Sequence, residues 1–94
     1  MSSILRNQGS KAVTTASTAE PLAATSIGFR EITIQAKLSN TDAIFIGNSA
    51  VDSTNGIILY STQSINLTIG GDLNDLYIDS AINGEGVQFF YTES

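Results

Sequence analysis

The densest group of residues that could carry chemistry is a short acidic segment in the last third of the chain. Four oxygen-bearing side chains lie within it: Asp72, Asn74, Asp75 and Asp79. Carboxylate and amide oxygens at this spacing are typical calcium ligands. In the EF-hand pattern, however, Leu76 would occupy a ligand position and Tyr77 the position of the invariant glycine. The alternative is a turn between strands, in which Asp and Asn side chains accept hydrogen bonds from nearby backbone N–H groups.

Residue types exclude most catalytic arrangements. The chain has no Cys and no His, which removes thiolate nucleophiles, Ser-His-Asp triads and the common zinc sites. Asp75 and Asp79 are four positions apart, so on a strand they share one face, whereas glycosidase carboxylates face each other across a cleft. Gly70-Gly71 could form an anion-binding turn, but the lysine of a P-loop is missing. We therefore expect no catalytic, cofactor-binding or metal site, and no enzymatic activity.

Aromatic side chains near the end of the chain are candidates for a binding surface. Phe89, Phe90 and Tyr91 are consecutive, and a strand with alternating side chains cannot bury all three on one face. If Phe89 and Tyr91 face the core, Phe90 is exposed, and Tyr77 points away from the core face of its own strand in the same way. Exposed aromatics on a sheet are typical of subunit interfaces. Burial under the N-terminal segment and stacking on a sugar are the alternatives.

Residues 1–26 differ in composition from the remainder of the chain. Twelve of the seventeen residues from 10 to 26 are Ser, Thr or Ala, and the only proline, Pro21, lies among them. This segment is expected to form either an extended arm or one or two edge strands, around Val13 and Leu22. Residues 27–94 are expected to form the folded domain. The residues expected at an interface are Val13, Pro21, Leu22, Tyr77 and Phe90.

Short strands must position all of these residues. The chain contains 12 Ile, 10 Thr and 3 Val, and β-branched side chains favour sheets. From residue 28 onward strand signals recur, over residues 29–38, 43–47, 57–60, 65–69, 76–78 and 87–92. The clearest is 29–38, where Ile32, Ile34, Ala36 and Leu38 alternate with polar residues. No stretch has helical apolar spacing. The sequence predicts an all-β fold: a small antiparallel β-sandwich or jelly-roll-like barrel of about 6–8 short strands with an extended N-terminal arm.

Charge is distributed unevenly along the chain. The net charge is −5, yet all four basic residues lie in the first 37 positions, and residues 38–94 contain seven acidic and no basic residues. This pattern argues against a nucleic acid or an anionic membrane as partner, because both need clustered Lys and Arg. A basic patch on another protein would be complementary. The first residues also lack the basic and apolar regions of a signal peptide, so none is expected.

A series of short motifs resembles one group of proteins. In chain order the motifs are Val13-Thr14-Thr15-Ala16 leading to Pro21-Leu22-Ala23, Ile34-Gln35-Ala36, Asn40-Thr41, Ile46-Gly47-Asn48 with Val51, Asn55-Gly56-Ile57 with Leu59, the segment Asp72 to Asp79, and Gly84-Glu85-Gly86-Val87 leading to Phe90-Tyr91. Over roughly residues 12–92 the pattern resembles small virion structural proteins of tailed bacteriophages and prophages, in particular β-sandwich capsid decoration (cement) proteins.

This resemblance implies a homo-oligomer, often a trimer, that binds the assembled capsid and bridges major capsid proteins, with the N-terminal arm supplying part of the contact. It also implies a protein made in the host bacterial cytoplasm and located in the virion, without cofactor. Two alternatives remain open. The first is a tail, neck or fibre-base component of the virion. The second is a small module that binds a host glycan through Tyr60, Tyr77 or Phe90 beside polar loops.

Overall fold

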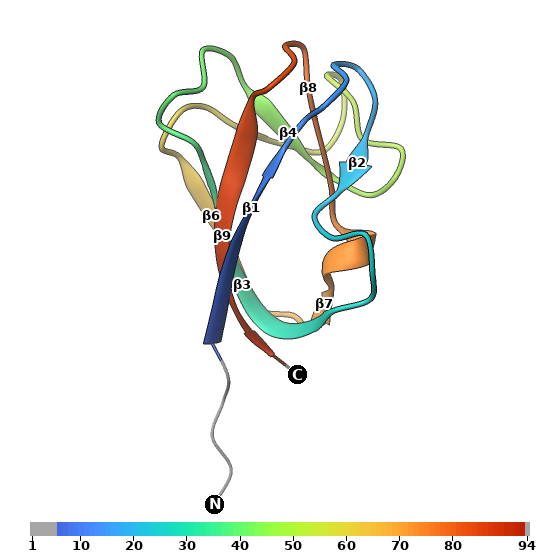
Figure 1. The fold of residues 1–94 in the computed structure, drawn as a ribbon, viewed down its shortest axis with the longest axis vertical. Helices are drawn as coiled ribbons and strands as arrows, with labels where there is room; N and C mark the ends of the chain where they lie inside the picture. Colours follow the sequence, from blue (N-terminus) through green and yellow to red (C-terminus); the bar gives the residue numbers. More distant parts are fainter. Residues whose placement is uncertain (1–5, 94) are drawn as a thin grey trace, which may run out of the picture.

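The protein is a sandwich of two antiparallel sheets (Figure 1), as a computed structural model describing residues 6–93 shows. The first sheet has the order β1 (Arg6–Ala12), β9 (Gly86–Glu93), β3 (Gly28–Ala36) and β6 (Ser64–Leu67), and β7 (Gly71–Asp72) pairs with the start of β3. The second has the order β2 (Glu20–Pro21), β8 (Tyr77–Ser80), β4 (Ile44–Gly47) and β5 (Ile57–Leu59). Within residues 6–93 the only helical element is the 3-10 turn η1 (Leu73–Asp75). The predicted all-β sandwich is confirmed, with nine strands instead of six to eight.

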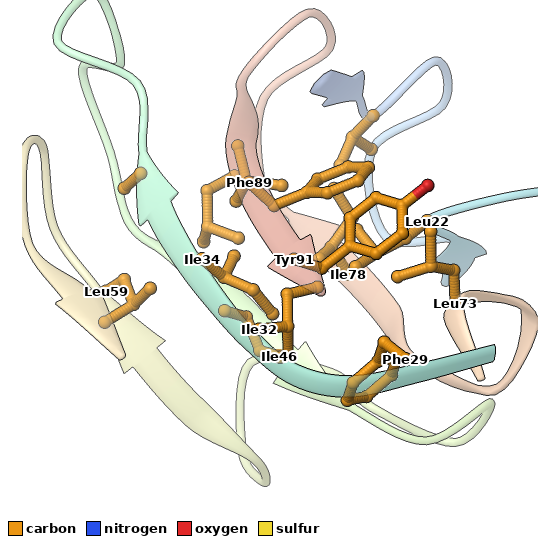
Figure 2. Packing of buried hydrophobic residues seen from close by; sticks show 14 residues of the cluster. Leu22, Phe29, Ile32, Ile34, Ile46, Leu59, Leu73, Ile78, Phe89 and Tyr91 are labelled. Atoms are coloured by element: carbon orange, nitrogen blue, oxygen red, sulfur yellow. The ribbon is translucent and has the colours of Figure 1, made fainter. Parts of the chain in front are cut away.

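The core lies between β3 and β9 of the first sheet and β4 and β8 of the second. Ile32 and Ile34 on β3 are fully buried, and Phe89 and Tyr91 on β9 lie beside them with ring centroids 5.9 Å apart (Figure 2). The alternation expected for both strands is therefore confirmed. Leu38, expected on the same face, is exposed because β3 ends at Ala36 and the chain turns away.

A β-bulge in β3 adds one more buried aromatic residue. The pairing of β3 with β9 shifts register between Phe29 and Glu31, which turns Phe29 toward the core although its parity is opposite to that of Ile32. Gly71 of β7 lies opposite Phe29, and a Cβ atom there would come within 3.1 Å of the Phe29 ring. The segment Gly71–Asp72 is therefore a short extra strand whose glycine accommodates a core ring.

The second sheet is also buried on part of its outer face. Ile44 and Ile46 of β4 face the main core, whereas Phe45 between them packs with Ala43 and Val51 in a second, smaller cluster. Tyr77 and Ala19 pack against this cluster. A short strand with three consecutive buried residues is the expected result of coverage on both faces.

The N-terminal segment corrects one part of the predicted fold. β1 pairs with β9 over seven residues, from Arg6 opposite Thr92 to Ala12 opposite Gly86, and β2 pairs with β8. Residues 6–26 are thus built into the sandwich, with a strand at the edge of each sheet, because β9 and β8 offer unpaired backbone groups there. The extended arm is not shown. The part of it that falls on residues 1–5 lies outside the described residues.

Candidate functional site

The acidic segment forms a turn. Asp72 Oδ1 accepts hydrogen bonds from the backbone N–H groups of Asn74 (2.8 Å) and Ile27 (3.0 Å), and Asp72 Oδ2 accepts one from the Ser26 hydroxyl. The Ser26 hydroxyl, followed by the two N–H groups, lowers the pKa of Asp72. Within residues 6–93, no three His, Cys, Asp or Glu side chains come together as metal ligands. The side-chain oxygens of Asp72 thus cap the start of η1 and bind Ser26 and Ile27, the residues that precede β3.

A small hollow of about 240 Å³ over the second sheet is lined in part by two further carboxylates, Asp52 and Asp79. Asp52 accepts hydrogen bonds from the hydroxyl and N–H of Thr54 and from the Asn55 amide, and the Thr54 hydroxyl is the main group that lowers the pKa of Asp52. The buried Asp79 accepts from the N–H of Ser80 at 2.8 Å. Both carboxylates thus accept hydrogen bonds from groups close to them in the sequence, Asp52 within a turn and Asp79 at the end of β8.

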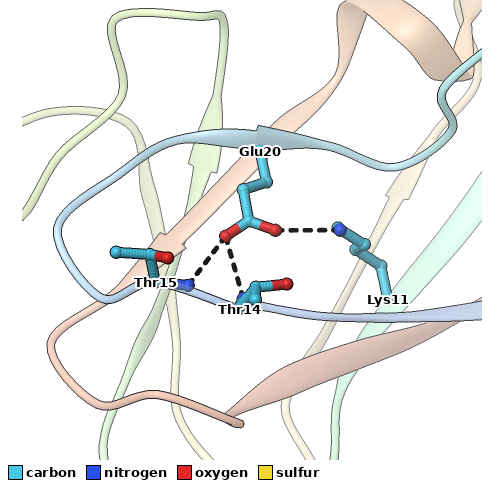
Figure 3. A network of polar contacts seen from close by, with 4 residues as sticks. All are labelled: Lys11, Thr14, Thr15 and Glu20. Atoms are coloured by element: carbon cyan, nitrogen blue, oxygen red, sulfur yellow. Dashed lines mark hydrogen bonds and ion pairs between the residues drawn. The ribbon is translucent and has the colours of Figure 1, made fainter.

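An ion pair joins the edge strands of the two sheets (Figure 3). Lys11 Nζ on β1 lies 2.9 Å from Glu20 Oε1 on β2, and Glu20 Oε2 accepts from the N–H groups of Thr14 (2.8 Å) and Thr15 (3.0 Å). Partial burial alone would raise the pKa of Glu20, but the Thr15 N–H and the Lys11 ammonium outweigh it, so that the pKa falls to about 2. The ion pair and these hydrogen bonds therefore link the edge strands β1 and β2 across the side of the sandwich.

The five residues predicted at an interface occupy three different places. Val13 and Leu22 are buried in the main core of the chain itself. Pro21 and Tyr77 are half-buried register partners on the second sheet, and Tyr77 contacts the small cluster around Phe45. Phe90 is 48% exposed, as predicted, on the outer face of the first sheet. The structure does not bring these five side chains together into one surface, and their role at an interface stays a prediction.

The opposite side of the sandwich carries exposed apolar side chains. β5 ends the order of the second sheet, and Ile57 (44%), Ile58 (47%) and Tyr60 (58%) are exposed along it. The exposed Leu38 lies nearby, because the Ser61 hydroxyl donates to the Leu38 carbonyl at 2.9 Å. We call these four residues the β5 edge patch. The sequence predicted the strand 57–60 but not the patch, although four consecutive apolar residues in so short a strand were a signal for it.

The outer face of the first sheet contains an open groove of about 540 Å³. Its lining side chains come from three neighbouring strands: Gln8, Ser10, Thr33, Gln35, Gln88 and Phe90, with Gly9 and Phe89. The Gln88 amide donates to the Gln35 amide oxygen at 2.9 Å. The strand periods predicted that Gln88 and Phe90 share a face, but only the pairing of β1, β9 and β3 assembles the groove.

Compared with known proteins, the chain matches no family model, no curated protein and no solved structure. The β-sandwich fold is therefore the part of the resemblance to phage virion proteins that is shown. Within the part of the chain that the structure describes, helical structure is nowhere long and apolar enough to cross a bilayer.

Proposed function

We propose that this protein is a structural virion subunit that self-associates, with a trimer favoured, and decorates a phage capsid by bridging major capsid proteins. The observation that carries the proposal is the β5 edge patch. An exposed, apolar strand at the end of a sheet presents unpaired backbone groups and readily pairs with another chain. Contiguous exposed apolar side chains are likewise typical of protein–protein contact sites.

The two sides of the sandwich differ in a way that supports this surface. β1 carries Arg6 and Lys11, and the two-residue β2 contains Pro21, so that side has the features that discourage strand addition. On the opposite side, residues 53–71 include β5 and β6 and contain no charged residue. Natural sheet edges that remain exposed usually carry charge, so the two uncharged edge strands β5 and β6 fit a subunit contact.

The location in the phage head is supported by the motifs that resemble capsid decoration proteins. The absence of Cys and His from the sequence fits a structural role. The partner would be the major capsid protein, and the site of action the virion. A tail, neck or fibre-base location is compatible with the same fold, since small β-sandwiches serve many roles. Labelling of intact particles with gold-conjugated antibody separates these locations: label on heads supports the proposal, and label confined to tails contradicts the capsid assignment.

Solution mass is the direct test of self-association. Light scattering after size exclusion should give about three times 9.9 kDa for the wild-type protein. Ile58→Lys places a charge on the exposed face of β5 and should give a folded monomer. Ile82→Lys is the matched control, because Ile82 is similarly exposed (40%) but lies in the β8–β9 connection, outside the patch.

The same variants test the capsid contact. Wild-type protein and Ile82→Lys should co-sediment with mature phage heads, and Ile58→Lys should remain in the supernatant. A wild-type monomer at every concentration that also fails to co-sediment with heads would overturn the proposed function. Unchanged oligomer mass in Ile58→Lys would exclude the β5 edge patch as the contact between subunits.

A further inference from the structure

We propose that the groove on the outer face of β1, β9 and β3 binds a neutral carbohydrate chain, with Phe90 as the stacking platform and glutamine side chains as hydrogen-bonding groups. This inference does not depend on the capsid role, and it uses a face of the sandwich other than the β5 edge patch. It rests on the geometry of the groove, the chemistry of its lining and the exposure of a single aromatic ring.

Strand register arranges the lining in two rows across the sheet. In one row Gln8, Phe90 and Thr33 are register partners, and Asn66 of β6 continues it. The second row consists, in the same order of strands, of Ser10, Gln88, Gln35 and Ser64. Because the side chains of register partners project on the same side of a sheet, all eight face outward together. The groove lies over the parts of these rows on β1, β9 and β3, and its volume of about 540 Å³ is within the usual size of a small-ligand site.

The lining contains amides, hydroxyls and one exposed aromatic ring, that of Phe90, beside the buried Phe89, and none of its residues is charged. An amide both donates and accepts hydrogen bonds, which matches a sugar hydroxyl that does the same. Next to the row of Gln8, Phe90 and Thr33, the row of Arg6, Thr92 and Glu31 carries one charge of each sign, so the two charges offset each other for a charged polymer. A neutral saccharide therefore fits the groove better than a nucleic acid or an acidic polysaccharide.

Phe90 lies in the middle of the first row and is 48% exposed, between the side chains of Gln8 and Thr33. A flat apolar ring bordered by hydrogen-bonding groups complements a pyranose, which has an apolar C–H face and a rim of hydroxyls. The core of a protein interface is instead built from several apolar and aromatic side chains. A single exposed ring surrounded by amides and hydroxyls therefore favours a sugar over a protein as the ligand of the groove.

The lining is also held in place before any ligand binds. Gln88 donates to Gln35 Oε1 at 2.9 Å, Gln35 donates to the Thr62 carbonyl at 3.0 Å, and Asn66 donates to the Thr33 hydroxyl at 2.8 Å. Side chains fixed on paired strands lose less conformational entropy on binding than side chains on loops.

Nuclear magnetic resonance titration tests the proposal on the intact chain. The ¹⁵N-labelled protein would be titrated with neutral oligomers of glucose, mannose and N-acetylglucosamine, and with oligogalacturonate as an acidic comparison. At least one neutral oligomer should shift the side-chain amide signals of Gln35 and Gln88 and the backbone signal of Phe90. Oligogalacturonate should leave these signals in place.

Variants of the platform complete the test. Phe90→Ala should weaken binding of the responding oligomer at least tenfold, whereas Phe90→Tyr, which keeps the ring, should bind within about threefold of wild type. Ile82→Ala is the matched control, since it removes an exposed apolar side chain (40%) from the β8–β9 connection, outside both the groove and the β5 edge patch, and it should leave binding unchanged. Thermal unfolding of each variant verifies that the fold is intact.

Three results would overturn the proposal. One is the absence of shifts with every neutral oligomer. The second is undiminished binding in Phe90→Ala. The third is a shift of the groove signals with rising protein concentration in the absence of sugar, which would assign this face to self-association instead.

Discussion

The side chain of Asn40 forms hydrogen bonds with both backbone polar groups of Gly86. Its Nδ2 donates to the Gly86 carbonyl at 2.8 Å and its Oδ1 accepts from the Gly86 N–H at 3.0 Å, in a buried setting. The adjacent Glu85 carboxylate accepts from the N–H groups of Thr41 and Asp42. The loop between β3 and β4 is therefore fastened to the start of β9 by two polar side chains, one from each segment.

Removal of the Asn40 amide should be costly. Asn40→Ala deletes both buried hydrogen bonds, and the Gly86 carbonyl keeps only the bond that it accepts from the Lys37 N–H. We therefore expect a loss of about 2–3 kcal/mol in the free energy of unfolding. Urea denaturation measures this loss. Asn7→Ala, at an exposed position where the amide contacts Glu93, should change the same quantity by less than about 0.5 kcal/mol. Similar losses in the two variants would contradict the structural role of Asn40.

Two glycines, Gly84 just before β9 and Gly86 at its first position, should respond very differently to alanine. At Gly86 a Cβ atom would lie 2.3 Å from the Lys11 carbonyl oxygen and 2.9 Å from the Ala12 Cα, both backbone atoms of β1. The start of β9 would have to move away from β1, and we expect Gly86→Ala to cost about 3 kcal/mol or more.

At Gly84 the space around a Cβ atom is open, and only the backbone angle φ of +89° is unfavourable for alanine. Gly84→Ala should therefore cost about 1 kcal/mol. Thermal unfolding of the two variants makes the comparison. A Gly86→Ala protein as stable as Gly84→Ala would show that β1 is not held against β9 as closely as described.

The Glu20 network should make part of the stability depend on pH. The pKa of Glu20 falls from 4.5 to about 2 in the folded protein, so the folded state favours the ionised carboxylate. Because the folded-state pKa is the lower one, this contribution is fully present above about pH 4.5 and is lost as the pH falls through about 2. Glu20→Gln should therefore destabilise the protein by about 1 kcal/mol at pH 7 and by much less at pH 2.

Chemical denaturation of wild type and Glu20→Gln at several pH values provides the measurement. Glu31→Gln serves as the control, since Glu31 is exposed on β3 and makes no hydrogen bond or ion pair within residues 6–93; it should change stability little at either pH. A difference between wild type and Glu20→Gln that stays constant from pH 7 to pH 2 would rule out an ionised Glu20 as the stabilising group.

Local stereochemistry made the strongest parts of the fold predictable. The alternation of Ile32 and Ile34 with polar neighbours identifies a half-buried strand, because successive side chains of a strand point to opposite faces. The same rule predicted that Phe90 points away from the face shared by Phe89 and Tyr91; in the structure Phe89 and Tyr91 are buried and Phe90 is exposed. β-branched composition and frequent turn residues were enough for the all-β class.

Long-range pairing determined the features that sequence patterns did not predict. β1 has no apolar alternation of its own and becomes a strand because β9 presents seven partners to it. The inward position of Phe29 follows from a bulge that is defined only relative to β9. Asn40 reaches Gly86 across 46 positions of the chain, a distance at which no local pattern carries information.

For the two candidate binding surfaces, the residue types were likewise predictable from the sequence, whereas the arrangement of the residues was not. The types of their residues, an uncharged apolar run at 57–60 and amides beside Phe90, are properties of the sequence alone. That β5 ends a sheet, and that Gln8, Phe90 and Thr33 lie in one row, are consequences of strand order and register. Strand order and register are set by hydrogen bonds between segments far apart in the chain, so only the tertiary structure could place these residues on surfaces.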